Sequence, residues 1–472
     1  MKVNAISVNQ ITTDVKEALA KEETVTPKLK TCVYALLDVV EALTQRLNLH
    51  SQNSSKPPSS DPNRKKKKST KKSAKNPGGQ PGRVGKQLKL VAKPDRIETI
   101  KLDKRRLPKG KYREAGFESR QVVDYEVSVI ITEYRAQALI DGHGNRFVAE
   151  FPPQAKRPIQ YGQTIKGHAV YLSQFQLLPY KRIEDYFIEH MDIALSTGSL
   201  FNFNKEAYNL LGKFDTMAKE KLIDSELAHT DETGINMNGK RLWLHAVGND
   251  QWTYLYPHTK RGSEAMDEIG IIPAFAGVLC HDHWKPYYTY TQCKHALCNA
   301  HHLRELEWSS TVGGQRWAKT MKNFLEQLNK KVNAAGGKLS VKQSAQYKKC
   351  YRRILRFGDS ESPNPPRKQG QRGRLKKTKS RNLLERLRNY EGDVLRFIDH
   401  EIVPFTNNQG ENDLRMTKVQ QKISGCFRSM EGAYIFCRVR SYLITCRKHG
   451  IGAKEALQIL FRGKLPDFSD SS

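Results

Sequence analysis

Hydrophobic residues near the start of the chain recur at helical spacing. The positions of one stripe are three or four residues apart, and they are Val33, Leu36, Val40, Leu43 and Leu47. This spacing predicts an N-terminal helix within residues 1–50, whose apolar face suits a short coiled coil with a second copy of the chain. Docking of the same face on the chain itself is an equal alternative, because the heptads are few.

The period changes to two between residues 88 and 153. Alternation is clearest where Tyr125, Val127, Val129 and Ile131 are separated by polar side chains. A period of two is typical of strands with one buried face. We therefore expect a small β-rich module here.

Residues 154–222 return to helical spacing. Pro179 precedes one predicted helix, and Ser196, a good N-cap residue, precedes the next. Two helices joined by a short turn suit a helix-turn-helix-like DNA-binding module, in which Lys181 and Arg182 would contact DNA. An ordinary helical pair without DNA contacts is an equal alternative.

The rest of the chain mixes strand and helix patterns. Residues 223–308 begin with three short apolar runs broken by Asn-Gly and Gly-Asn turn signals, which predict an antiparallel meander. Much of the stretch 309–395 is polar and basic, and the gap to the next core-forming pattern is far longer than one crossover needs. Residues 396–462 return to core-forming patterns, and 463–472 form a tail. The chain is thus expected to be a multidomain α/β protein.

The net charge of the chain indicates which class of partner it binds. At 472 residues the chain exceeds one hydrophobic core, and its formal net charge is +31. Residues 62–86 hold ten Lys and Arg, residues 367–381 hold eight, and neither run contains an acid. Such runs favour a nucleic-acid partner through counterion release, although a solvated tail is the alternative.

The first basic run lies in a segment, 51–87, whose Ser, Pro, Gly and Lys content predicts a flexible linker. The residues of the two runs that we expect to contact DNA phosphates are Arg64, Lys65, Lys66, Lys67, Lys68, Lys71, Lys72, Arg83, Arg372, Arg374, Lys376 and Lys377.

No apolar stretch is long enough for a membrane span, and the N-terminus does not resemble a signal peptide. Neither basic run has the apolar face that binding to a membrane surface requires. The eight cysteines are irregularly placed, which favours reduced thiols over a disulfide framework. The sequence therefore predicts a cytoplasmic protein, associated with the nucleoid through DNA.

Three carboxylates stand at positions suited to metal chemistry. Asp231 lies in the first run of the meander, and strand alternation turns its neighbour Glu232 to the opposite face. Asp282 follows the apolar run FAGVLC, and Glu411 lies on a helix predicted after Pro404. Three such carboxylates would suit two magnesium or manganese ions, with positions left for water and phosphate.

The helix of Glu411 carries further polar residues on the same face. Asn407, Asn408, Arg415 and Lys418 share this face, at spacings of three, four and seven from Glu411. Asn408, Arg415 and Lys418 could support the active site, and Arg415 and Lys418 could hold the DNA backbone. Any acid alone is more often solvated than functional. The order of two strand-associated aspartates followed by a helical glutamate favours a catalytic role for the three together.

A cluster of Cys and His residues follows Asp282. The spacing Cys298-x-x-His301 is compatible with zinc, but a structural zinc site is not the favoured interpretation. We expect His301, and Arg304 one turn along, to approach the active site. Cys280 and Cys298 are expected to be small core residues.

Several strings, in one order, resemble a known family. They are SSKPPSSD, GGQPGRVG, TDETG, GVLCHDHWKPYY, CNAHHLRELE and VPFTNNQGENDLRMTKVQQKISGCFRS. From about Ser51 to about Phe461 the chain resembles the transposases of the insertion-sequence 66 family of bacterial mobile elements. The resemblance implies an RNase H-like core with a DDE triad, for which the matching residues are Asp231, Asp282 and Glu411. It also implies that residues 309–395 are a mainly helical insertion.

The chain departs from that family after the GGQPG string. Many relatives have a small zinc-binding module there, but this chain has no cysteine between Cys32 and Cys280. Arg83 also stands where many relatives have His. A zinc-free β module is therefore the expectation.

The expected function is a DNA transposase that cuts the ends of its element and joins the 3′ hydroxyl to target DNA. Two ends must meet, so a homo-oligomer on DNA is expected, and the resemblance implies possible accessory proteins of the same element. The alternatives are an RNase H-like nuclease or resolvase without strand transfer, and a non-catalytic DNA-binding regulator derived from a transposase.

Overall fold

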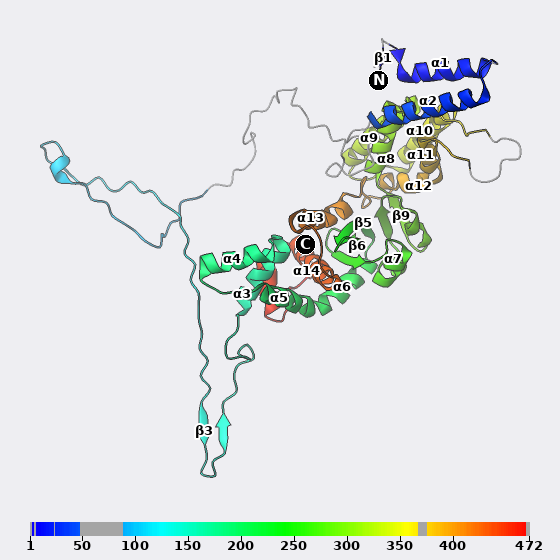
Figure 1. Cartoon of the computed structure of the whole chain (residues 1–472). Coiled ribbons are helices and arrows are strands. Elements are labelled where there is room, and N and C mark those ends of the chain that lie inside the picture. The colour runs from blue at the N-terminus through cyan, green and yellow to red at the C-terminus, as the bar shows by residue number, and fades with distance from the viewer. Residues whose placement is uncertain (1, 4–5, 23, 48–87, 367–374, 469–472) are drawn as a thin grey trace. The chain divides into compact units, whose positions relative to one another are not determined.

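The computed structural model describes residues 2–3, 6–22, 24–47, 88–366 and 375–468 (Figure 1). The chain divides into a small unit, Lys66–Glu133, and a large unit, which comprises Met1–Lys65 and Tyr134–Ser472. Among the described helices, none combines the length and the apolar composition that crossing a membrane requires.

The described part of the small unit, residues 88–133, is extended. Its one helical turn is η1 (Lys104–Arg106), and these residues form no strand. The side chain of Gln121 accepts from the Val91 N–H at 2.8 Å and donates to the Val91 carbonyl at 2.7 Å. This amide bridge joins two distant stretches of the extended chain.

The expected β-rich module over residues 88–153 is reduced to one hairpin. Strands β3 (Ala138–Ile140) and β4 (Arg146–Val148) pair antiparallel, but the alternating residues 125–131 lie in no strand. Alternation produces a strand only when a partner and an apolar surface are available to bury one face. Here Ile131 is 92% exposed, so that strand prediction was wrong.

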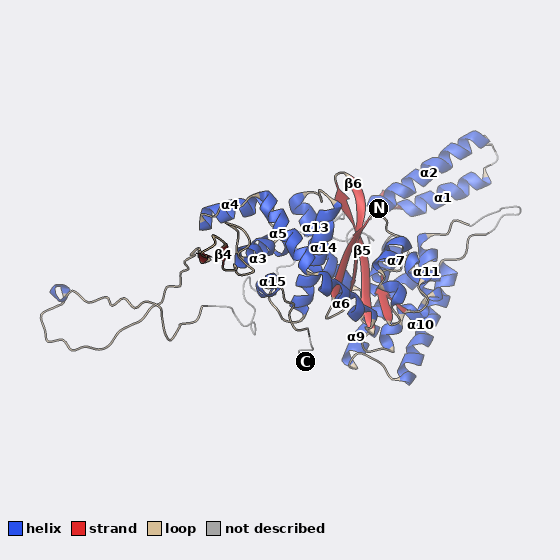
Figure 2. Cartoon of the chain, turned by 90° about the horizontal axis from the view of Figure 1, so that it is seen from below, coloured by secondary structure: helices blue, strands red, loops and turns tan. Residues whose placement is uncertain are grey.

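The N-terminal region is a helical hairpin. A short β1 (Lys2–Val3) and β2 (Ile6–Ser7) ladder precedes α1 (Val8–Lys21) and α2 (Pro27–Leu47), which lie side by side in Figures 1 and 2. The predicted stripe falls on α2, yet Leu36 is 63% exposed. The hairpin therefore leaves part of the stripe uncovered.

Helices fill the region before the main sheet. They are α3 (Gln163–Val170), its π-helical continuation η2 (Tyr171–Phe175), α4 (Tyr180–Met191), α5 (Thr197–Leu210) and α6 (Gly212–Ile223). Pro179 precedes α4, and the Ser196 hydroxyl accepts from the Ser199 N–H at 3.1 Å, as an N-cap does. Both predicted helix starts are confirmed.

The main sheet has five strands in the order β7-β6-β5-β8-β9. Its members are β5 (Leu227–Met237), β6 (Lys240–Gly248), β7 (Thr253–His258), β8 (Val278–His281) and β9 (Lys294–Leu297). The first three form the predicted antiparallel meander, with Asn238 and Gly239 at positive φ in the first turn. Strands β8 and β9 then run parallel to β5, so the sheet is mixed.

Helices cover both faces of this sheet (Figure 2). Helices α13 (Asn408–Ser424) and α14 (Met430–Lys448) pack on the meander, where Leu414 and Phe436 meet Leu244 and Ala246. Between β7 and β8 the chain forms α7 (Ser263–Ile269) and η3 (Ile272–Ala274). The sheet is thus a middle layer between helices.

Helix α15 (Ala453–Phe461) packs against α3, far earlier in the sequence. Both helices, together with α5, α6 and α14, contribute to one hydrophobic core that also includes sheet residues. The Phe214 and Tyr442 rings meet edge-to-face in it, with centroids 5.3 Å apart. The helical region predicted to be a DNA-binding module therefore shares its core with the C-terminal helices.

Residues 309–395, predicted to be an insertion, contain mainly helices in their described parts. After α8 (Asn299–Thr311) come α9 (Arg316–Ala334), α10 (Val341–Glu361), α11 (Lys379–Asn389) and α12 (Glu391–Val394). A separate core around Trp317, Tyr351 and Leu384 holds them together, and it extends to β8 and β9.

Candidate active site

Asp231 lies in the middle of the central strand. In the β5–β6 register it pairs with Ala246, which contacts the α13 layer, so Asp231 faces α13. Burial raises the pKa of the Asp231 carboxyl well above its usual range, and the negative charges of Glu232, Asp282 and Glu411 raise it further. The charges of the other two sequence-predicted carboxylates therefore reach Asp231.

Asp282 follows the end of β8. The parallel register sets His229 of β5 opposite Cys280 of β8, and Asp231 and Asp282 each come two residues later. The Trp284 N–H donates to Asp282 Oδ1 at 2.9 Å, and His283 between them has φ +74°. This tight turn keeps the Asp282 side chain at the end of the strand.

Glu411 lies in the first turn of α13 and is exposed. The start of that helix is fixed by Asn407, whose side chain donates to the Thr230 carbonyl at 2.8 Å and contacts His229 Nδ1 at 2.7 Å. These bonds attach α13 to β5 directly beside Asp231. Asn407 is 1% exposed, and the sequence placed it on the face of Glu411 without indicating this anchoring role.

Glu232 lies on the other face of β5, as strand alternation predicts. It accepts from Arg261 Nε at 2.7 Å and from the Tyr287 hydroxyl. The Arg261 guanidinium lies over the Trp243 and Trp284 rings, 4.8 and 4.3 Å from their centroids. Burial raises the pKa of Glu232, and Tyr287 and Arg261 oppose that effect.

The predicted supporting residues on α13 differ in their surroundings. Lys418 donates to the Gly234 carbonyl at 2.7 Å, three residues beyond Asp231 on β5. Burial and the charge of Arg241 lower the pKa of Lys418, while Asp231 opposes this. Asn408, Arg415 and Lys418 are all exposed. Of these supporting residues, Lys418 is the one that the contacts join to the strand of Asp231.

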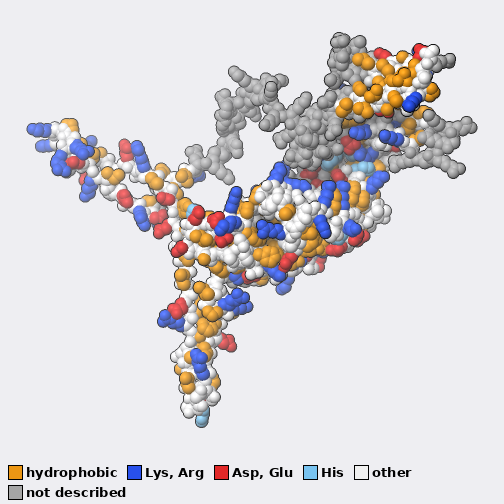
Figure 3. Space-filling model, viewed as in Figure 1, with side chains coloured by type: hydrophobic (Ala, Val, Ile, Leu, Met, Phe, Trp, Pro, Cys, Tyr) orange, Lys and Arg blue, Asp and Glu red, His pale blue; other side chains and the backbone are white. Residues whose placement is uncertain are grey.

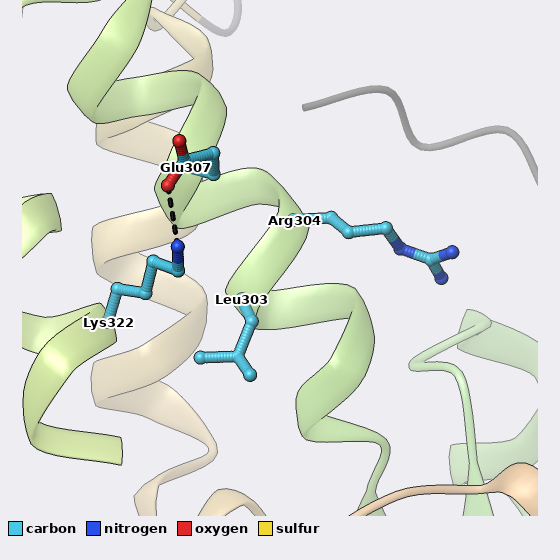
Figure 4. A pocket seen from close by; sticks show the side chains of 4 residues that line it. All are labelled: Leu303, Arg304, Glu307 and Lys322. Carbon is cyan, nitrogen blue, oxygen red and sulfur yellow. Dashed lines mark hydrogen bonds and ion pairs between the residues drawn. The ribbon is translucent and has the colours of Figure 1, made fainter. Parts of the chain in front are cut away.

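His301 and Arg304 lie on α8. Burial and the neighbouring charge of Arg304 lower the pKa of His301 to about 4, so the imidazole is neutral at pH 7. The charge of Asp282 opposes that shift, which places His301 within electrostatic reach of the carboxylates. In Figure 4 Arg304 extends away from the ion pair of Glu307 with Lys322, whose atoms are 2.7 Å apart.

Cys298 is the N-cap of α8 and is 1% exposed. Its Sγ, one ring nitrogen of His301 and a Glu411 carboxylate oxygen all lie within 4.8 Å of one another. Cys280 is fully buried, and burial raises the pKa of its thiol. Both cysteines are core residues as predicted, but the approach of Glu411 to Cys298 was not predicted.

The predicted DNA contacts fall into two groups. Outside the described residues lie Arg64, Lys65, Lys66, Lys67, Lys68, Lys71, Lys72, Arg83, Arg372 and Arg374. Among the described ones, Lys181 lies 3.1 Å from Asp185 and Lys377 donates to Glu385, whereas Arg182 and Lys376 are exposed. In Figure 3 Lys and Arg side chains are spread among acidic and apolar ones.

Two family models match most of the chain. Residues 158–435 match the model described as "Transposase IS66 family", and residues 5–89 match a family of unknown function, DUF6444. No curated protein matches the chain. The first match covers more than half of the 472 residues and includes all three carboxylates. The chain therefore belongs to the IS66 family of DDE transposases.

Proposed function

We propose that the chain cuts DNA at the ends of its insertion element and joins the freed 3′ hydroxyl to target DNA, using Asp231, Asp282 and Glu411. Family membership implies transposition, an RNase H-like core and the general use of divalent metals. The mixed five-stranded sheet between helices agrees with such a core. The observation that carries the proposal is that the negative charges of Asp282 and Glu411 both raise the pKa of the buried Asp231.

Their chemistry suits hard cations. Among the described residues, none of the three carboxylates has an ion-pair partner within 4.0 Å, whereas Glu232 beside them is neutralised by Arg261. Like charges held together without a counterion are costly unless protons or cations compensate them. Carboxylate oxygens are the ligands that Mg²⁺ and Mn²⁺ prefer. Bound ions would activate water and then the 3′ hydroxyl for attack on phosphate.

The protein itself contributes position and charge. The sheet holds Asp231 and Asp282 next to each other, and Asn407 fixes the helix that carries Glu411. Lys418, bonded to the Gly234 carbonyl, adds a cation within electrostatic reach of Asp231. A cation in this position could bind an incoming phosphate group. The remaining DNA contacts are assigned to the two basic runs, and pairing of two ends to a homo-oligomer.

The proposal is tested with the full chain, labelled duplexes of the element's ends, a target plasmid and Mg²⁺ or Mn²⁺. We expect nicks and joined products. Asp231→Asn, Asp282→Asn and Glu411→Gln should each lower the cutting rate by at least about 1,000-fold, because each removes a metal ligand. The matched control is Glu264→Gln, an exposed glutamate that also lies in the first turn of a helix.

Cutting by all three variants at the wild-type rate would refute the triad. Nicks without joined products would instead indicate a nuclease, and DNA binding without any cutting would indicate a regulator. The Glu264→Gln variant should cut like the wild type in every case.

A further inference from the structure

Two helices begin side by side next to the three carboxylates. Helix α8 starts after Cys298, and α13 starts after Asn407. The Asn407 N–H donates to Cys298 Sγ at 3.1 Å, and the Asn299 N–H donates to the Phe405 carbonyl at 3.0 Å. These two bonds fix one helix start against the other.

Three different donor atoms meet at this junction. Cys298 Sγ, a His301 ring nitrogen and a Glu411 carboxylate oxygen lie within 4.8 Å of one another. His301 Nδ1 is buried and has no hydrogen-bond partner among the described residues. A buried imidazole nitrogen without a partner is uncommon, because an unpaired polar atom is costly. It is available as a ligand.

We propose that Cys298, His301 and Glu411 bind one zinc ion, and that this ion withholds Glu411 from the magnesium site. The second half of this proposal rests on the function proposed above. A thiolate, an imidazole and a carboxylate form a donor set that favours zinc, whereas Mg²⁺ takes oxygen ligands. The third ligand distinguishes this site from a zinc site inferred from the Cys-x-x-His spacing alone.

The geometry requires only a small adjustment. Zinc bound tetrahedrally at bond lengths of 2.0–2.3 Å keeps its ligand atoms about 3.5 Å apart. The three atoms here already lie within 4.8 Å. Glu411 is exposed and can shift, while the Asn407 N–H would continue to donate to the thiolate of Cys298.

The sum of the charges around the three donor atoms also favours the binding of a cation. Each helix start carries about half an elementary positive charge from its peptide dipoles, which opposes cation binding. The Cys298 thiolate and the Glu411 carboxylate together supply two negative charges. Binding releases the thiol proton to solvent, so one proton should appear per zinc bound near neutral pH.

Cobalt substitution tests the binding directly on DNA-free protein. We expect the wild type to bind one tight equivalent of Co²⁺ with a thiolate-to-metal charge-transfer band and tetrahedral d–d absorption, both displaced by Zn²⁺. Cys298→Ser should lose the band and weaken zinc binding by at least about 100-fold. Serine keeps the size and can still accept from Asn407.

The matched control is Cys293→Ser, which alters another buried thiol outside the cluster. It should leave the band unchanged. A wild type without a charge-transfer band would overturn the site even if every variant misfolded. An equal band in Cys298→Ser would overturn it too.

The inhibitory half has a separate readout. One equivalent of Zn²⁺ should stop Mg²⁺-dependent nicking by the wild type and leave the Cys298→Ser variant active. Inhibition of both proteins alike, or of neither, would overturn it. A wild type that binds Co²⁺ as expected but never cuts DNA would refute the proposed function and leave the metal site standing.

Discussion

At the scale of single residues, Asp231 and Glu232 are neighbours in sequence, but only Glu232 has an ion-pair partner among the described residues. Arg261 and Tyr287 donate hydrogen bonds to the Glu232 carboxylate, and the Arg261 charge compensates it. Asp231 has no ion-pair partner in the described parts of the chain, and the charges of three other carboxylates raise its pKa. Adjacent acids on opposite faces of one strand can thus serve different purposes, one in holding the fold and the other, as proposed above, in binding cations.

This difference predicts a dependence of stability on pH. The pKa of Asp231 is raised in the folded state, so folding favours its protonated form, and the metal-free protein loses stability as pH rises from the unfolded-state pKa of about 3.9 through the raised folded-state pKa. In EDTA at pH 7, Asp231→Asn should therefore unfold at a higher urea concentration than the wild type. The difference should vanish as pH falls below about 3, where Asp231 is protonated in both folded and unfolded states.

Added Mg²⁺ should stabilise the wild type more than Asp231→Asn, because the variant has lost a ligand. Glu264→Gln should match the wild type under all these conditions. A variant that is less stable at pH 7, or a difference independent of pH, would contradict the prediction.

Single residues were also where sequence reasoning reached its limit. Asp231, Asp282 and Glu411 could be selected from their order along the predicted elements. Asn407 could not be separated from Asn408, because both begin the same helix and only packing shows which one is buried. The proximity of Cys298 to Glu411 could not be predicted, since more than 100 residues separate them and no local pattern encodes that contact.

At the scale of elements, the contact between α13 and β5 decides whether the third carboxylate reaches the first two. Asn407 makes that contact through Thr230 and His229. Asn407→Ala leaves both partners unsatisfied and should lower stability by about 2–4 kcal/mol. It should also slow cutting by about 10- to 100-fold, because Glu411 loses its fixed position.

Denaturant unfolding and the nicking assay measure these two effects. Asn408→Ala, one residue further along and exposed, is the matched control and should change stability by less than about 0.5 kcal/mol. Equal behaviour of the two variants would show that the contact does not position Glu411.

Elements were predicted well where a local signal exists. The meander followed from its turn residues, and the starts of α4 and α5 followed from Pro179 and Ser196. The extended residues 125–131 show the opposite case. Alternation describes a strand that has a surface to cover, and the sequence alone does not reveal whether such a surface exists. Strand order, with β8 beside β5, likewise depends on contacts between distant segments.

At the scale of the whole molecule, the net charge of +31 predicts how binding responds to salt. Each phosphate neutralised on duplex DNA contributes about 0.9 to the slope of log affinity against log salt. Replacing Lys65, Lys66, Lys67 and Lys68 together by Gln should therefore reduce that slope by up to about 4.

Binding measured by fluorescence anisotropy at several salt concentrations tests this. Lys205→Gln is the control, since Lys205 is not among the predicted DNA contacts and lies 2.7 Å from Glu431, and it should leave the slope nearly unchanged. An unchanged slope in the fourfold variant would mean that these lysines do not contact phosphate.

The packing of α15 against α3 has a consequence for synthesis on the ribosome. Helix α3 and its neighbours emerge early, but their core is completed only by α14 and α15. Glu411 also follows the whole helical insertion. A nascent chain would therefore carry both aspartates for much of translation without a finished scaffold or a third ligand. Since the proposed cutting needs all three carboxylates, it should begin only after translation has passed all of these helices, and an interrupted chain should leave DNA uncut.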